Sequence, residues 1–348
     1  MTKPTIAVTM GDPAGIGPEV CLQLLANAGV CSGLTPVVFG DAGILAQCAK
    51  HTGLAMPINI VEEREWPKLY ATIDKPSVLH LPGFDATNFR PGVVSAQTGA
   101  AGYRYVIKSI EAALANQVAA VATGPLNKEA LRAAGIPYPG HTEIFADKTH
   151  AKRACMFQYS DEVRASFVTV HVGYHEVPAL LTIDRIVDVI ELTNDAMKRI
   201  RGTRPKLCVL GLNPHAGEHG LFGNREEELI IIPAIKAARS KGYDVEGPVP
   251  PDTAFLPAKR RSTDAFICMY HDQGHIPLKA LAFDNAVNTT LGLPITRTSV
   301  DHGTACDIAW QGLANGSSMV EAVRLAARLA SCDAPNGNGV TDDRSDRR

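Results

Sequence analysis

The chain lacks the features that mark membrane proteins and nucleic-acid-binding proteins. Its longest apolar runs, such as 118–122 and 207–212, are of strand length and too short to cross a bilayer. The 34 Lys and Arg residues are balanced by 36 Asp and Glu residues, so no excess of positive charge favours a nucleic acid. Aromatic residues make up 6% of the chain, and no basic stripe alternates with them. We expect neither a membrane nor a nucleic-acid partner.

Signals for secretion and for cysteine-based scaffolds are also missing. The first residues, MTKPTIAVTM, lead directly into an expected strand without an apolar signal core. The eight cysteines form no C-x-x-C pair, and several, such as Cys208 and Cys268, lie within apolar stretches. This usage predicts small buried side chains in a reducing compartment, not disulfides or a zinc knuckle. We expect the protein to be cytoplasmic.

What the chain does contain is a regular alternation of strand-like and helix-like runs. Short apolar runs joined by helices of period 3.6 predict a mostly parallel sheet with helices on both faces, and 348 residues suggest about two domains. Asp41 is placed to cap one helix, and Gly53 and Gly242 are placed to end two others. Residues 332–348 lose all apolar periodicity and are predicted to be a disordered tail.

The polar loops follow expected strands, where ligands bind in open α/β sheets. They read MGDPAGIGPE, TGPLNKEA, HVGYHE, NPHAGEHG and YHDQGHIPLK, after strands starting near 5, 118, 167, 207 and 266. The last three carry His171, His215 and His271 close to the strand ends. With carboxylates nearby in the sequence (Glu218, Asp252, Asp272), these imidazoles suit an open divalent-metal site. The alternative is that each is an ordinary polar group near a sheet edge.

The first loop imitates a dinucleotide-binding fingerprint but departs from it. Gly15 and Gly17 open a helix after a strand, yet the third glycine position is Val20, and Pro18 removes a backbone donor. No convincing acidic residue follows about 20 positions later. An ordinary Rossmann site is therefore not expected here.

Two segments are suited to binding an anion. The run 140–143, Gly-His-Thr-Glu, opens a helix whose free N–H groups could accept a phosphate, although Thr142 could simply cap that helix. Lys279, Asn288 and Arg297 lie in a mostly apolar stretch, where a cation needs an anionic partner. That partner is either a ligand or an internal carboxylate such as Asp284.

Together these motifs resemble the 4-hydroxythreonine-4-phosphate dehydrogenase family of vitamin B6 biosynthesis and its paralogues. The resemblance covers Ile6 to about Ala330 through GDPAGIGPE, TGPLNKEAL, GHTE, NPHAGE, MYHDQG, LGLP and RTSVDHGTA. It implies a two-domain α/β fold like that of isocitrate and isopropylmalate dehydrogenases, with an interdomain cleft. The expected first domain is 1–137 with 296–331, and the second is 138–295. It also implies a homodimer with its active site near the subunit interface.

The resemblance assigns roles to individual residues. It implies that His171, His215 and His271, drawn from both subunits, bind one divalent metal per subunit (Zn, Mg, Co or Mn). It implies that a small phosphorylated hydroxy acid contacts His141, Thr142, Lys279, Asn288 and Arg297. NAD or NADP would bind a late loop, 301–312, through His302, Gly303, Thr304, Ala305 and Asp307. Lys128, Asp252 and Asp272 are candidates for proton transfer, and each has an orienting or structural ion pair as its alternative.

The implied reaction is hydride transfer from the substrate C3 to the nicotinamide, followed by loss of CO2. His275 in HDQGHIPLK and Pro251 look more like the paralogues that convert 4-phospho-D-threonate or 4-phospho-D-erythronate to dihydroxyacetone phosphate. The alternative substrate is 4-phosphohydroxy-L-threonine, used in pyridoxal phosphate biosynthesis. A branch acting on aromatic cis-dihydrodiols is disfavoured by the intact GHTE. An acyltransferase of phosphate ligands and a sugar-acid phosphate sensor are the competing classes.

Overall fold

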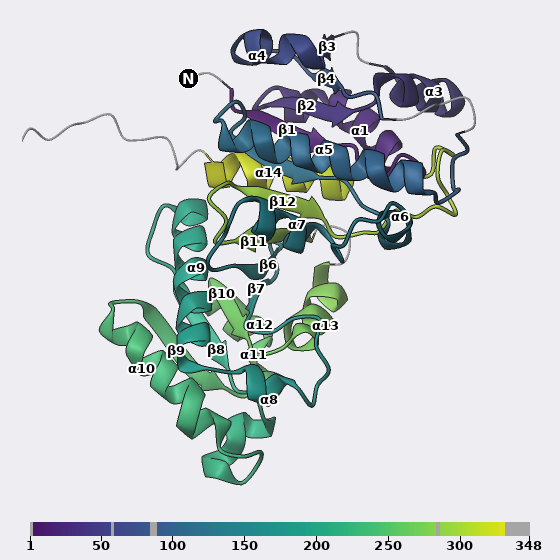
Figure 1. The fold of residues 1–348 in the computed structure, drawn as a ribbon. Coiled ribbons are helices and arrows are strands. Elements are labelled where there is room, and N and C mark those ends of the chain that lie inside the picture. The colour runs from purple at the N-terminus through teal and green to yellow at the C-terminus, as the bar shows by residue number, and fades with distance from the viewer. Residues whose placement is uncertain (1–2, 57–58, 84–88, 283–285, 331–348) are drawn as a thin grey trace, which may run out of the picture.

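A computed structural model describes residues 3–56, 59–83, 89–282 and 286–330, and its elements are arranged around one long sheet (Figure 1). The twelve strands lie side by side in the following order: β3 (Ile60–Glu62), β4 (Ser77–His80), β2 (Thr35–Gly40), β1 (Thr5–Thr9), β5 (Ala120–Thr123), β12 (Arg297–Val300), β11 (Val287–Leu291), β6 (Cys155–Tyr159), β7 (Arg164–Phe167), β10 (Ala265–Cys268), β8 (Lys206–Leu210) and β9 (Asp244–Val249).

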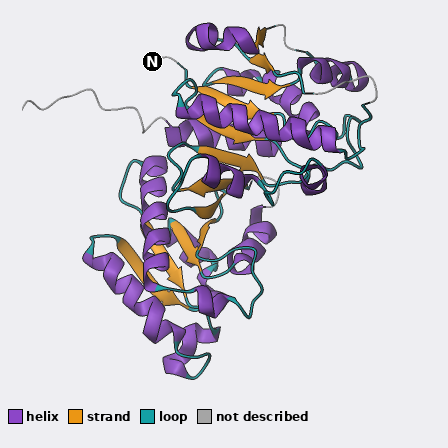
Figure 2. Cartoon of the chain, in the orientation of Figure 1, coloured by secondary structure: helices purple, strands orange, loops and turns teal. Residues whose placement is uncertain are grey.

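Helices connect these strands and cover the sheet (Figure 2). They are α1 (Gly17–Leu25), α2 (Ala28–Cys31), α3 (Ala42–Thr52), α4 (Trp66–Leu69), α5 (Ala96–Leu114), α6 (Lys128–Ala133), α7 (His141–Lys148), α8 (Val177–Leu180), α9 (Ile183–Arg201), α10 (Ile232–Ser240), α11 (Pro251–Ala254), α12 (Pro257–Ser262), α13 (His271–Ala282) and α14 (Ser317–Ala330). In the described part of the chain, no helix is both long enough and apolar enough to cross a membrane.

Local sequence explains where many of these elements begin and end. The Asp41 carboxylate accepts hydrogen bonds from the backbone N–H groups of Gly43 and Ile44, and Gly53 ends the same helix at φ 75°. Gly242 follows α10 at φ 90°. The caps expected at these three positions are therefore confirmed. Two strand positions differ from expectation, since β5 begins at Ala120 and β7 ends at Phe167, where a strand was expected to begin.

Most neighbouring strands are parallel, as the alternating pattern predicts. Strands such as β2 and β10 are buried along their whole length, which is typical of parallel strands covered on both faces. The pairs β12–β11, β11–β6 and β6–β7 are antiparallel. Three successive reversals make the parallel strands β7, β10 and β8 run opposite to β1, β5 and β12.

The strand order also bears on domain organisation. The first six strands in the list come from residues 5–123 and 297–300, and the other six come from residues 155–291. This grouping supports the expected division into 1–137 with 296–331 and 138–295, which we retain as a proposal. One cluster of buried apolar side chains, from Ile6 in β1 to Ile267 in β10, extends through both groups. The predicted α/β class is confirmed, and the predicted tail 332–348 lies outside the described residues.

Candidate active site

Two of the three predicted metal ligands lie side by side. The loop after β7 carries His171, and α13 begins with His271 directly after β10, which pairs with β7. Their ring centroids are 5.6 Å apart. Both line a cavity of about 270 Å³ with Thr169, Tyr174 and Tyr270. Because the two strands are parallel neighbours, their carboxyl ends bring the two imidazoles together.

The His271 imidazole is oriented by the next residue along α13. Asp272 Oδ1 lies 2.6 Å from His271 Nδ1, and Asp272 Oδ2 accepts a hydrogen bond from the Tyr174 hydroxyl. The Tyr174 hydroxyl and the neighbouring His271 hold the pKa of the Asp272 carboxyl below its usual range. An ionised carboxylate accepts hydrogen bonds only, so His271 Nδ1 is the donor to Asp272, which leaves Nε2 for a ligand. This arrangement is common behind metal-binding histidines.

His275 supports His271 from the other side. The two rings stack at 3.8 Å, and His275 also stacks on Phe167 at 4.6 Å. His275 Nδ1 lies 3.0 Å from the His271 carbonyl oxygen, and burial lowers the pKa of His275 to about 4, so the ring is neutral. The Gln158 amide nitrogen lies 3.2 Å from His275 Nε2 and donates to Asp301 at 3.0 Å. This network joins the paired histidines to the start of the predicted nucleotide loop.

The third predicted ligand, His215, lies apart from the other two. It stands in a turn, Pro214–Gly220, in which residues 215–219 all have left-handed backbone angles. Asp252, on α11 next to this turn, is exposed. Among the described residues, no three His, Cys, Asp or Glu side chains of one chain come together as a metal site. The donor set of a single chain is therefore two imidazoles with one oriented Nε2, which fits half of a site completed by other ligands.

The second feature of interest is a buried cation. Arg297, the first residue of β12, is 2% exposed and donates hydrogen bonds to the hydroxyls of Thr290 (3.0 Å) and Thr123 (2.9 Å). Its Nε has no hydrogen-bond partner, and no carboxylate forms an ion pair with it among the described residues. Burial lowers the pKa of Arg297 to about 9, while the charge of Glu143 opposes that shift. A guanidinium buried in this way favours an anionic ligand.

Of the other predicted phosphate ligands, His141 lies within electrostatic range of Arg297. His141 is the first residue of α7, its Nε2 is buried without a partner, and burial together with the Arg297 charge holds its pKa well below the usual range. Asn288 in β11 also has a buried, unpartnered Oδ1. Gly140 is the N-cap of α7 and no side chain caps it, so the alternative role of Thr142 as the cap is not observed. Lys279 is exposed on α13, and Asp284 lies outside the described residues.

Lys128 comes from the first group of strands, and its charge acts on a histidine that follows the second group. It begins α6 after β5 in the first group of strands, whereas His171 follows β7 in the second group. The pKa of His171 is lowered by burial, then by the charges of His271 and Lys128, while Glu143 raises it. Lys128 and Glu143 therefore lie within electrostatic range of His171, and Glu143 also acts on the pKa of Arg297.

The predicted nucleotide loop packs against the first glycine-rich loop. The Ile16 backbone N–H donates to the Thr304 carbonyl oxygen at 2.9 Å, and a Cβ on Gly15 would come within 2.5 Å of that oxygen. Ala305 has a φ of 42°, whereas Gly303 and Asp307 are exposed. The His302 Nδ1 contacts the Gly303 carbonyl oxygen, and its Nε2 is buried without a partner. Gly15 is therefore required for the close packing of the first loop against Thr304.

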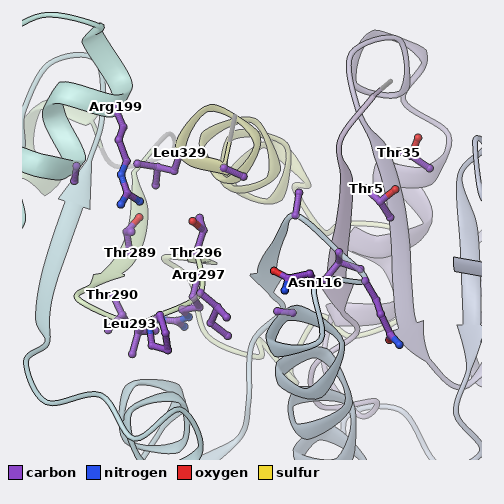
Figure 3. Close-up of a pocket in the computed structure, with 18 of the residues that line it drawn as sticks. Thr5, Thr35, Asn116, Arg199, Thr289, Thr290, Leu293, Thr296, Arg297 and Leu329 are labelled. Carbon is purple, nitrogen blue, oxygen red and sulfur yellow. The ribbon is translucent and has the colours of Figure 1, made fainter. Parts of the chain in front are cut away.

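A larger cavity, of about 1100 Å³, lies elsewhere (Figure 3). It is lined by the first residues of three parallel strands, Thr5, Thr35 and Arg297, and therefore lies at their amino ends. Of the predicted site residues, only Arg297 contributes to its lining. Ligands of open α/β sheets bind at the carboxyl ends, which disfavours this cavity as the active site. The Arg297 side chain, which donates to Thr123 at the carboxyl end of β5, is shared between this cavity and the candidate site.

Several residues of the site were not predicted from the sequence. Tyr174 lies within HVGYHE, a segment already suspected, but its hydrogen bond to Asp272 joins residues that are 98 positions apart. Gln158, Thr123 and Thr290 lie within strands, where nothing in the local pattern distinguishes them from structural polar residues.

An α/β fold with paired imidazoles and a buried guanidinium whose Nε is unpartnered is typical of an enzyme that acts on a small anionic metabolite. Comparison with known proteins specifies the family. The model described as "Pyridoxal phosphate biosynthetic protein PdxA" matches residues 32–326. This chain belongs to the PdxA family of dehydrogenases.

Relatives carry two different names. A D-threonate 4-phosphate dehydrogenase of Pectobacterium atrosepticum is 44% identical over 335 residues, covering 93% of this chain and 99% of the relative. A 4-hydroxythreonine-4-phosphate dehydrogenase of Desulforapulum autotrophicum is 42% identical over 336 residues, covering 96% and 98%. The crystal structure of a 4-hydroxythreonine-4-phosphate dehydrogenase from Klebsiella pneumoniae has a TM-score of 0.83 at 41% identity, covering 94% of this chain and all of that one.

Proposed function

We propose that this chain is a metal-dependent NAD(P) dehydrogenase that oxidises and decarboxylates a 4-phosphorylated 3-hydroxy acid. The observation that carries the proposal is the buried Arg297 guanidinium with its unpartnered Nε, in a chain that also pairs the imidazoles of His171 and His271. A phosphate would accept a hydrogen bond from the free Arg297 Nε. His141, whose pKa is lowered in part by the Arg297 charge, and Asn288 are proposed to contact the same phosphate. Thr142 and Lys279 are proposed to complete this anion site.

One divalent ion per subunit (Zn, Mg, Co or Mn) is proposed to bind between His171 and His271, with His215 of a second copy as the third ligand. Two imidazoles per chain and a third on a separate exposed turn support a shared site. A second copy would also cover large apolar side chains exposed around the site, which are Val172, Tyr174, Leu221, Phe222 and Ile276. A homodimer is the simplest assembly with these properties.

The coenzyme, NAD or NADP, is proposed to bind loop 301–312 through His302, Gly303, Thr304, Ala305 and Asp307. The exposed Gly303 leaves room for close approach, since no heavy atom lies within 4 Å of an added Cβ. The hydrogen-bonded link from Asp301 through Gln158 to His275 supports placing this loop beside the metal site.

When bound, the metal ion would polarise the substrate oxygens, and the nicotinamide would accept the hydride from C3. The side chains of this chain would anchor the substrate, transfer a proton and orient His271. Arg297 and its neighbours anchor the phosphate and fix the substrate relative to the paired histidines. Lys128 is the best placed of the three proton-transfer candidates, because its charge already acts on His171. Asp272 is engaged in orienting His271, and Asp252 lies beside the His215 turn.

For the substrate, we propose 4-phospho-D-threonate or 4-phospho-D-erythronate, giving dihydroxyacetone phosphate. His275, one of the two residues that resemble the paralogous branch, is stacked directly on His271, so this difference lies inside the site. The alternative is 4-phosphohydroxy-L-threonine, the substrate of the biosynthetic branch. The relative named 4-hydroxythreonine-4-phosphate dehydrogenase, at 42% identity, keeps this alternative open.

The deciding experiment follows NADH formation by absorbance with each of the three substrates, with and without a chelator. Turnover of the two sugar-acid phosphates that exceeds turnover of the amino-acid phosphate by tenfold or more in kcat/KM, and is lost with chelator, is expected. A preference for 4-phosphohydroxy-L-threonine would instead support the biosynthetic role. Turnover unaffected by chelator, or by His271→Ala, would rule out the metal assignment.

A further inference from the structure

The loop carrying His171 is tied to the helix carrying His271 by one side-chain hydrogen bond. Tyr174, three residues after His171, donates its hydroxyl to Asp272 Oδ2. Asp272 Oδ1 lies 2.6 Å from His271 Nδ1. The same carboxylate therefore holds both an aromatic side chain of one ligand-bearing segment and the imidazole of the other.

From this geometry we propose that Tyr174 is a positioning residue that acts through Asp272 to fix the relative placement of His171 and His271. The proposal rests on the metal site put forward above. It assigns to this chain a Tyr–Asp–His linkage whose role is to preorganise two ligands before the ion arrives.

The loop of residues 171–176 depends on this hydrogen bond, because few other contacts restrain it. Residues 171–176 are all exposed, and His171 itself has a φ of 40°, which an L-residue adopts at a cost. Within the loop, the only side-chain hydrogen bond in the described structure joins Glu176 to the Gly173 backbone N–H. That bond shapes the turn but does not connect it to α13. Tyr174 supplies this connection, although 68% of the residue is exposed.

The geometry of the tyrosine ring is consistent with a fixed position. The Tyr174 ring packs edge-on against Tyr270, with centroids 5.8 Å apart and planes at 87°. Tyr270 immediately precedes His271, so both the ring and the hydroxyl of Tyr174 contact the segment 270–272. Removing the hydroxyl alone would keep the ring contact and release the carboxylate.

The test measures metal affinity directly, without turnover. The full-length protein is stripped of metal, and its Zn²⁺ dissociation constant is determined by competition with a chromophoric chelator. Tyr174→Phe is expected to weaken Zn²⁺ binding about tenfold, in line with other residues that orient metal-binding histidines. With Co²⁺ as the probe, the visible absorption bands of Tyr174→Phe are expected to change in intensity or position, because the two imidazoles are held less uniformly.

Two further variants isolate the mechanism. Asp272→Ala should weaken Zn²⁺ binding at least as much, and adding Tyr174→Phe to it should change nothing further, because the tyrosine acts through the carboxylate. Tyr138→Phe is the matched control, since it removes a tyrosine–aspartate hydrogen bond (Tyr138 to Asp147, 2.6 Å) on another surface. Its Zn²⁺ affinity should equal that of the wild type.

The outcomes separate this inference from the proposed function. If the unmodified protein binds Zn²⁺ and loses it with His271→Ala, the metal site stands. A change of less than twofold with Tyr174→Phe would then overturn the role of Tyr174 alone. A full tenfold effect that persists in the Asp272→Ala background would also overturn it. Failure of the unmodified protein to bind either ion would remove the metal site and this inference together.

Discussion

At the scale of single residues, burial decides which polar groups depend on a ligand. Arg297 satisfies two of its donors with the Thr290 and Thr123 hydroxyls but leaves Nε unpartnered at 2% exposure. Uncompensated burial of a cation is costly, and an anionic ligand offsets that cost. Such a residue therefore contributes more to binding than to the stability of the empty protein.

Arg297→Lys should accordingly impair substrate binding. Lysine keeps the charge but loses the planar fork that reaches two threonines and a phosphate together. The KM of the phosphorylated substrate should rise about tenfold or more, equivalent to ~1.4 kcal/mol, with a smaller change in kcat. Steady-state kinetics measures both. Arg153→Lys, in an exposed ion pair with Asp188, is the control and should leave KM unchanged. An equal effect of both variants would exclude a specific anion role for Arg297.

His141 predicts a pH dependence of stability. Burial and the Arg297 charge lower its folded-state pKa well below the ordinary 6.5, so at acidic pH the unfolded chain binds a proton that the folded chain resists. This contribution to stability is complete above pH 6.5 and decreases as the pH falls towards the folded-state pKa. Urea unfolding of metal-free protein measures this effect. Between pH 7 and 5, the free energy of unfolding should decrease less for His141→Asn than for the wild type. The control His51→Asn, at an exposed position, should show the wild-type dependence of the free energy of unfolding on pH. The same wild-type dependence for His141→Asn would contradict a lowered pKa of His141.

At the scale of elements, the π-helical turn before α10 supports the left-handed turn that carries His215. Glu227 lies in a π-helical turn, Glu227–Ile231, at the start of α10. Its Oε1 accepts hydrogen bonds from the backbone N–H groups of Leu212 (2.9 Å) and Asn213 (2.8 Å), which precede the left-handed turn that carries His215. Such π turns are frequent at functional sites. The strain at 215–219 is therefore balanced by interactions that also set the direction of His215.

Gly217 provides the test of this arrangement. It has a φ of 78°, and an added Cβ would lie 2.5 Å from Glu227 Oε2. Gly217→Ala should lower the free energy of unfolding and reduce metal-dependent kcat, because the turn must shift. Gly53→Ala is the matched control, with a φ of 75° and no atom within 4 Å, and should cost only ~1 kcal/mol of left-handed strain with normal kcat. Denaturant unfolding and kinetics distinguish the two; equal effects would show that contact with Glu227 is unimportant.

At the scale of the whole molecule, the separation of His215 from the other histidines predicts complementation between subunits. In a dimer with shared sites, His171→Ala and His215→Ala each inactivate both sites. A mixed dimer then has one site with both defects and one intact site. Mixing the two inactive variants under conditions of subunit exchange should restore about a quarter of wild-type activity. Absence of recovery despite exchange, or a monomeric mass by light scattering, would refute the shared site.

Some of this molecule was determined by the sequence alone. The strands, the Asp41 and Gly53 caps and the α/β class follow from apolar period and backbone preference, which act over a few neighbouring residues. Boundaries were less accurate, as at β7, because tertiary packing sets where a strand ends. The sequence also indicates the histidine-bearing loops as candidates for a metal site, because they follow expected strands. It indicates the Arg297 region as a candidate for an anion site, because a cation lies in an apolar run.

Only the tertiary structure decided how these candidates combine. It brought Lys128 within electrostatic range of His171, although the two residues follow different groups of strands, and it placed no third His, Cys, Asp or Glu of the described chain with His171 and His271. It also gave Asp272 a defined place between Tyr174 and His271. Sequence patterns report each residue's local environment, whereas contacts between residues 98 positions apart depend on strand order and twist. That is why the residue types of this site were predictable and their pairing was not.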